Sequence, residues 1–126
     1  MLAPRWLLVA AALSLGIATA LGAYGVHGLK EAVSEARYAA YESAVQIQFV
    51  HSLGLALVAL IRERLTRSNG WLTVASALLL AGMVMFSGSI YATTLGAPRA
   101  IGMMAPFGGS SLMLAWLCAA IGFARR

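Results

Sequence analysis

The sequence predicts an all-α integral membrane protein, a four-helix bundle that crosses the bilayer four times. Of its 126 residues, 61% are hydrophobic and only 10% are charged, and the mean hydropathy is +0.85. Soluble domains are usually about 45–50% apolar and about 25% charged, so these charged side chains are too few to cover a water-soluble globule. They also fall between long uncharged runs, which indicates a single transmembrane domain spanning residues 1–126.

Four apolar runs are long enough to cross a bilayer, which requires about 20 helical residues. Because hydrocarbon offers no partner to free backbone groups, and no period-two alternation interrupts the runs, we expect helices. We expect a charged segment, residues 29–41, either to extend the second helix outside the membrane or to lie at the interface as an amphipathic turn or two. Asn69-Gly70 is a helix-stop signal before the third helix. The predicted helices cover about residues 6–26, 31–62, 71–95 and 100–124.

The first run also resembles a secretory signal peptide, because it follows a basic start and ends in small residues. Its uncharged length, residues 6–26, exceeds the usual apolar core of about 7–15 residues. We therefore expect a retained helix.

The distribution of basic residues predicts the orientation. Cytoplasmic loops of membrane proteins are enriched in Lys and Arg. Four crossings place Arg5, Arg62, Arg64, Arg67, Arg125 and Arg126 on one side, and Lys30, Arg37 and Arg99 on the other. Both termini are therefore expected in the cytoplasm.

The net charge of +5 would suggest nucleic-acid binding in a polar protein. Here the charges flank apolar runs, so the lipid bilayer is the expected partner and no nucleic acid is expected. Cys118 is the single cysteine, which excludes an intramolecular disulfide.

Small residues recur at helical spacing in the first and fourth predicted helices. Such stripes allow helices in lipid to approach closely. They fit packing inside the bundle, and they also fit a contact in a homo-oligomer or with another membrane protein. The candidate packing residues are Ser14, Ala18, Gly22 and Gly25, and then Ser111, Ala115, Ala119 and Gly122.

The second predicted helix carries most of the intramembrane polarity: Glu42, Gln46, Gln48, His51 and Ser52. These residues lie on two opposite faces, so we expect the helix to sit centrally, away from lipid. Polar groups within a membrane are costly and often functional, although interhelical hydrogen bonds also explain them. We expect His51 to be a neutral ring bonded to Gln48 and to Ser87, Ser89 or Tyr91.

Cofactor and catalytic signals are weak. His27 lies at one end of the first helix and His51 lies deep in the second, so the two are not expected to share a haem or metal. The methionines lack nearby Cys or His ligands, and methionine is an ordinary filler of apolar cores. We therefore expect no catalytic residues, no metal and no cofactor.

Four local patterns resemble the bacterial family called domain of unknown function 423, related to the transmembrane protein 256-like proteins. They are GAYGVHGL at 22–29, QFVHSLGL at 48–55, FSGSIY at 86–91 and PFGG at 106–109. The chain departs from the family at Ile47 and Ser52. The resemblance implies a small four-helix inner-membrane protein and no established activity. Its matching positions are His27, Gln48, His51, Ser87, Ser89, Tyr91, Pro106 and Gly108.

Two functional hypotheses follow. The first is a non-enzymatic structural or accessory protein that self-associates or packs in a larger complex. The second is a binder or transporter of a small molecule, lipid, quinone or ion, using the polar second helix with Glu42 and Gln46. Residues 106–109 could then be the mid-membrane helix break found in many transporters.

Overall fold

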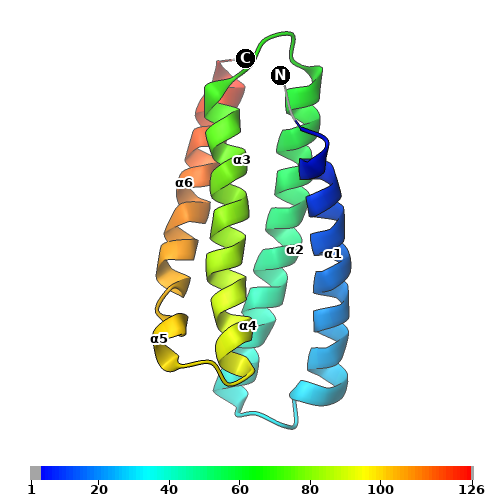
Figure 1. The fold of residues 1–126 in the computed structure, drawn as a ribbon, viewed down its shortest axis with the longest axis vertical. Coiled ribbons are helices and arrows are strands. Elements are labelled where there is room, and N and C mark those ends of the chain that lie inside the picture. The colour runs from blue at the N-terminus through cyan, green and yellow to red at the C-terminus, as the bar shows by residue number, and fades with distance from the viewer. Residues whose placement is uncertain (1–3, 126) are drawn as a thin grey trace.

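The computed structural model describes residues 4–125 and confirms the all-α, four-helix architecture (Figure 1). Each of four helical segments is long and apolar enough to cross a membrane. Two of them contain a wider, π-helical turn, labelled η. The elements are α1 (Trp6–Tyr24), η1 (Gly25–Leu29), α2 (Glu35–Arg64), α3 (Gly70–Met83), η2 (Val84–Gly88), α4 (Ser89–Thr94), α5 (Arg99–Gly102) and α6 (Ala105–Ala124).

Two polar residues set the starts of α2 and α3. The Ser34 hydroxyl accepts a hydrogen bond from the Arg37 backbone N–H at 3.1 Å, so α2 begins at Glu35, not near residue 31 as predicted. The Asn69 side chain accepts from the Leu72 N–H at 3.2 Å and so caps the start of α3. Asn69 was predicted as a stop signal, but its extended backbone and the hydrogen bond that its side-chain oxygen accepts make it an N-cap.

The fourth predicted helix is interrupted near one end. α5 ends at Gly102, and a turn at Met103 and Met104 separates it from α6. Pro106 lies in the first turn of α6, where its missing N–H costs no intrahelical hydrogen bond. The prediction of a break at 106–109 is therefore wrong, because the interruption precedes the proline and lies outside the middle of the helix.

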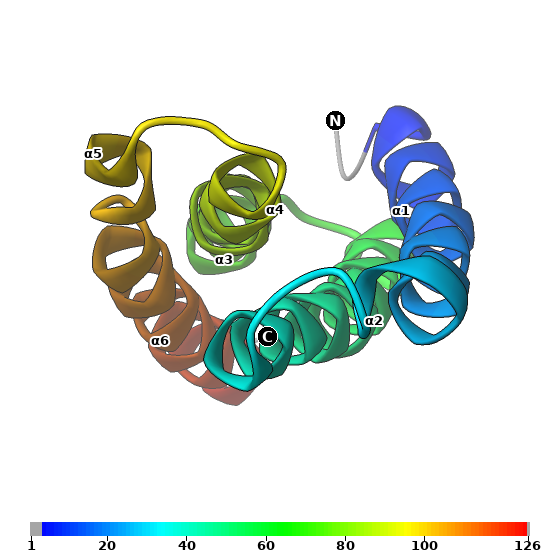
Figure 2. The same cartoon turned by 90° about the horizontal axis from the view of Figure 1, so that it is seen from below.

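The helices pack in the order α1, α2, α3 and α6, with α1 against α2, α2 against α3, and α3 against α6. Both termini lie at the same end of the bundle (Figure 1). The view along the bundle shows α1 and α3 on the same side of α2, with α6 beyond α3 (Figure 2). A core of buried residues that includes Leu55, Val58, Leu72 and Leu79 fills the interior.

Both small-residue stripes lie at contacts within this chain. On α1, Ala18 is fully buried, and side chains placed at Gly22 and at Gly25, the first residue of η1, would meet Val45 and Tyr41 of α2. On α6, Ala115 and Ala119 are buried, and a Cβ at Gly122 would lie 2.7 Å from the Leu72 side chain of α3. Packing within the bundle therefore accounts for both stripes.

Candidate functional site

A lateral groove runs along the bundle between α1 and α3. Its first part, about 550 Å³, lies toward the end that carries the termini, and its second part, about 360 Å³, lies toward mid-span. The two parts share Leu80 and Val84, so they adjoin each other between α1 and α3. Its walls are mostly apolar, with Leu13 and Ile17 on α1, Ala77 and Ala81 on α3, and Val84 at the start of η2.

Gln48 of α2 provides a polar centre in the floor of this groove. Its side-chain nitrogen donates to the Ser14 carbonyl oxygen at 2.9 Å and to the Ser14 hydroxyl oxygen at 3.2 Å. The Tyr91 hydroxyl donates to the Gln48 side-chain oxygen at 2.6 Å. The Ser52 hydroxyl donates to the Ser14 hydroxyl at 2.7 Å. We call these four residues, Ser14, Gln48, Ser52 and Tyr91, the Gln48 network.

The Gln48 network links α1, α2 and α4 through neutral hydrogen bonds. Both amide hydrogens of Gln48 have acceptors on Ser14, and its oxygen has a donor in Tyr91. Within residues 4–125, every fully buried side-chain nitrogen or oxygen has a hydrogen-bond partner. The network is therefore already satisfied without a ligand, and its direct effect is to hold α1 at a fixed position against α2.

The remaining FSGSIY residues extend the polar contacts along α2. The Ser87 hydroxyl, in the π-helical turn η2, donates to the Ala44 carbonyl of α2 at 2.8 Å. The Ser89 hydroxyl bonds its own helix, donating to the Phe86 carbonyl at 3.0 Å. The Tyr91 ring packs against the Tyr41 ring with centroids 5.5 Å apart. The π-helical turn adds one residue to the turn of helix that brings Ser87 against α2.

His51 does not join the Gln48 network. Its Nδ1 lies 2.9 Å from the Ile47 carbonyl oxygen, one turn earlier in α2, and this carbonyl can only accept a hydrogen bond from the ring. The ring packs near the Trp116 indole of α6, with centroids 6.0 Å apart. The predicted pairing of His51 with Gln48 is therefore wrong, because the His51 ring faces α6 while Gln48 faces α1.

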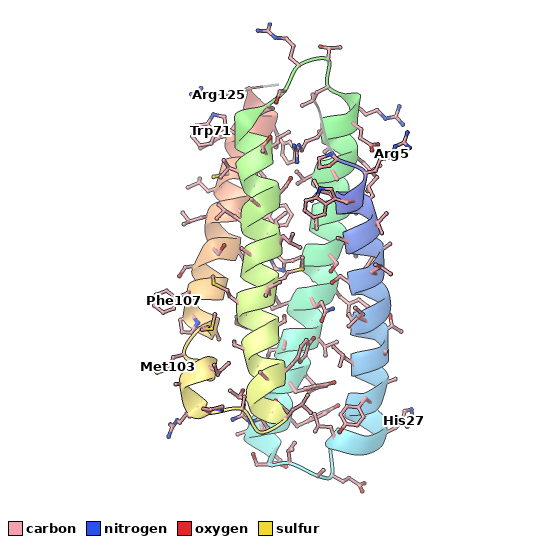
Figure 3. All side chains as sticks on the ribbon, viewed as in Figure 1. Arg5, His27, Trp71, Met103, Phe107 and Arg125 are labelled. Carbon is pink, nitrogen blue, oxygen red and sulfur yellow. The ribbon has the colours of Figure 1, made fainter. Side chains whose placement is uncertain are left out.

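Three predicted polar candidates lie outside the groove. Glu42 and Gln46 are exposed, contrary to the expectation that both polar faces of α2 are enclosed. The two faces differ because α1 and α3 cover only the face with Gln48 and Ser52. His27 is exposed and points away from the bundle (Figure 3). His27 and His51 therefore do not converge, and residues 4–125 contain no cluster of three or more His, Cys, Asp or Glu side chains.

Gly108 and Pro106 lie outside the groove, and each lies beside different residues. A Cβ at Gly108 would meet the Phe86 backbone of η2, so Gly108 marks the closest approach of α6 to that turn. Pro106 is exposed and lines a different, mixed polar pocket with Arg37 and Arg99. Neither residue lines the groove between α1 and α3.

Arg62 lines the groove, although its place in the sequence indicated only a role in topology. Arg62 is 6% exposed and donates one hydrogen bond to the Ser76 hydroxyl at 3.1 Å. The other last-turn arginine of α2, Arg64, is exposed. Its spacing in the sequence could have indicated that Arg62 is buried. Arg62 follows Val58 and Ala59 by four and three residues, so it lies on the same face of α2 as these buried residues.

Comparison with known proteins places the sequence among membrane proteins without an assigned activity. The family described as "Protein of unknown function (DUF423)" matches residues 21–109. The UPF0382 membrane protein YwdK of Bacillus subtilis is 32% identical over 87% of this chain and 89% of its own length. The UPF0382 inner membrane protein YgdD of Escherichia coli is 31% identical over 96% and 91%, respectively. No solved structure matches.

Proposed function

This chain belongs to the DUF423 family of membrane proteins, and from its own geometry we propose that it is a non-enzymatic accessory protein that holds a lipid acyl chain in the groove between α1 and α3. The observation that carries the proposal is that two adjoining, mostly apolar parts of one groove lie between α1 and α3. An apolar groove open on one side suits a hydrocarbon chain, and the bilayer supplies such chains.

The chemistry of the groove favours binding over catalysis. General acid–base catalysis needs a titratable group close to the reacting atoms. All four glutamates of the chain, Glu31, Glu35, Glu42 and Glu63, are exposed, and none lines the groove. The polar floor consists of neutral groups that already bond one another, namely the Gln48 network. These features support a protein that acts by binding and packing.

Self-association remains a prediction, but the small-residue stripes no longer support it. Both small-residue stripes are occupied by contacts within the chain, through Gly25 with Tyr41 and Gly122 with Leu72. A contact with another copy or with a larger complex would therefore use other surfaces. The exposed apolar residues Met103 and Phe107, which point outward in Figure 3, lie on one such surface.

We propose that the protein lies in the inner membrane, as the name of the Escherichia coli relative states for that protein, with both termini in the cytoplasm. Arg5 and Arg125 lie at the same end of the bundle, together with Trp71 (Figure 3). Trp is typical of membrane interfaces, and Arg is typical of the cytoplasmic side. Arg126, which also entered the charge count, lies outside the described residues.

The orientation predicts which loop is accessible from the periplasm. In a Cys118→Ala background, we expect a membrane-impermeant thiol reagent added outside intact cells to label Ala97→Cys and not Ser68→Cys. Ser68 is exposed in the loop before α3, and Ala97 lies in the turn after α4, at the opposite end of the bundle. Labelling of position 68 alone would mean that the termini face outward.

Blocking the groove tests the binding proposal. We expect Ala81→Phe to reduce photocrosslinking by a phosphatidylcholine with a diazirine in its acyl chain by about tenfold, because the phenyl ring would occupy the space beside Leu80 and Val84. The matched control is Ala120→Phe, an equal change on an exposed position of α6 that lines no part of the groove. Equal labelling of both variants and of the wild type would contradict the proposal.

A further inference from the structure

The Arg62 side chain is largely buried and positively charged, and it has no carboxylate partner among residues 4–125. It is 6% exposed, and its one hydrogen bond there goes to the Ser76 hydroxyl. That hydroxyl in turn donates to the Leu72 carbonyl at 2.9 Å, so it is a neutral partner. A guanidinium carries five N–H donors, and buried charges in proteins are normally paired with an opposite charge.

None of the four glutamates, all of which are among residues 4–125, supplies that opposite charge. Three of the four glutamates, Glu31, Glu35 and Glu42, belong to the opposite end of the bundle, where α2 begins. The fourth, Glu63, follows Arg62 in α2, but its side chain is exposed and about 100° away around the helix. The side chains that share the groove with Arg62 at this end are neutral: Trp6, Leu7, Thr73 and Ser76.

Arg62 lies near the end of the second membrane-spanning segment, where we expect the lipid phosphates. It is in the last turn of α2, beside the first turn of α1 and close to the exposed, interfacial residues Trp6 and Arg64. From this point, the apolar wall formed by Ala77, Leu80, Ala81 and Val84 continues toward mid-span. The groove thus has a positively charged donor at its interfacial end and apolar walls along the remainder. This arrangement matches a phospholipid, which has a charged headgroup at one end and apolar acyl chains along the rest.

We propose that Arg62 binds the phosphate group of an anionic glycerophospholipid from the leaflet on the side of the termini. This proposal rests on the proposed function, because the acyl chain of the same lipid would occupy the groove. The free N–H groups of Arg62 donate to the phosphate oxygens, and a planar guanidinium can donate two parallel hydrogen bonds to a phosphate. An anionic headgroup is favoured because a zwitterionic one brings its own cation to the site.

Competition between lipids tests the headgroup while leaving chain binding visible. The photoactivatable phosphatidylcholine described above is bound to the wild-type protein in detergent, and unlabelled phosphatidylglycerol or phosphatidylcholine is added. We expect phosphatidylglycerol to compete about tenfold better, as a charge-assisted hydrogen bond worth about 1.4 kcal/mol would give. Inorganic phosphate at equal concentration is expected to leave the crosslinking unchanged.

Two matched variants assign the preference to one side chain. Arg62→Gln should lose the preference for phosphatidylglycerol while keeping acyl-chain crosslinking. Arg64→Gln, which removes the same charge from an exposed position two residues later, should keep the preference. Circular dichroism and gel filtration check that each variant is folded. Arg62→Lys retains the charge with fewer directed donors and should give an intermediate preference if Arg62→Gln proves unstable.

The outcomes separate the two proposals. If the wild type binds the photoactivatable lipid in the groove but does not distinguish phosphatidylglycerol from phosphatidylcholine, the anionic-lipid site is wrong and the acyl-chain groove stands. If the preference is equal in the wild type and in Arg62→Gln, another group recognises the headgroup and the assignment to Arg62 is wrong. If the wild type is not crosslinked at all, the proposed function fails first. Competition by inorganic phosphate would identify a free anion site instead of a lipid site.

Discussion

We expect Gly108→Ala to lower the free energy of unfolding by about 2–3 kcal/mol, as overpacking of a close contact does. A Cβ at Gly108 would lie 2.8 Å from the Phe86 Cα and 2.9 Å from the Gly82 carbonyl oxygen, both backbone atoms. Backbone cannot rotate out of the way as a flexible side chain can, so α6 would have to separate from α3 and η2. Thermal unfolding in a mild detergent, followed by circular dichroism, measures the effect.

The neighbouring glycine is the matched control. A Cβ at Gly109 would have its nearest neighbour, the Phe86 ring, at 4.0 Å, which is ordinary van der Waals contact. Alanine is also a better helix former than glycine by about 1 kcal/mol. Gly109→Ala should therefore leave the melting temperature unchanged or raise it. A Gly108→Ala protein as stable as Gly109→Ala would show that α6 does not approach Phe86 this closely.

The second large effect is expected at the Gln48 network. Gln48→Leu should lower the free energy of unfolding by about 1–3 kcal/mol, because it removes the acceptor of the Tyr91 hydroxyl and the Gln48 donor that bonds Ser14. Single interhelical hydrogen bonds in membranes average about 0.6 kcal/mol, so Tyr91→Phe, which removes one bond, should have a smaller effect. Steric trapping or detergent unfolding gives the free energies.

The chain provides its own control for this prediction. Gln46 lies two residues before Gln48 in α2 and is exposed, so Gln46→Leu makes the same chemical change on the face away from α1. It should change the free energy of unfolding by less than about 0.5 kcal/mol, as surface substitutions usually do. If Gln46→Leu and Gln48→Leu lowered the free energy of unfolding equally, the loss of stability in Gln48→Leu could not be attributed to the bonds with Ser14 and Tyr91.

The number and approximate positions of the helices followed from the sequence. Uncharged runs of about 20 residues have few alternatives in a bilayer, where backbone groups must be bonded within the segment. The helix ends were less predictable, because they depend on local capping. Asn69 could have been either a stop signal or an N-cap, and only its extended backbone and its bond to the Leu72 N–H decide between the two.

The sequence by itself determined an all-α membrane protein with four crossings and a polar second helix, because composition and run length are properties of each segment alone. Only the tertiary structure decided which of its polar residues are enclosed. Gln46 and Gln48 are chemically identical and lie about 160° apart around α2, yet only Gln48 faces α1 and Tyr91. Burial depends on what a neighbouring helix places opposite, and an α1 that is apolar on all sides gives no sequence signal of which face it presents. For the same reason, the sequence indicated only that Arg62 contributes to the topology. Its position in the groove depends on α1 and α3, which pack on either side of it.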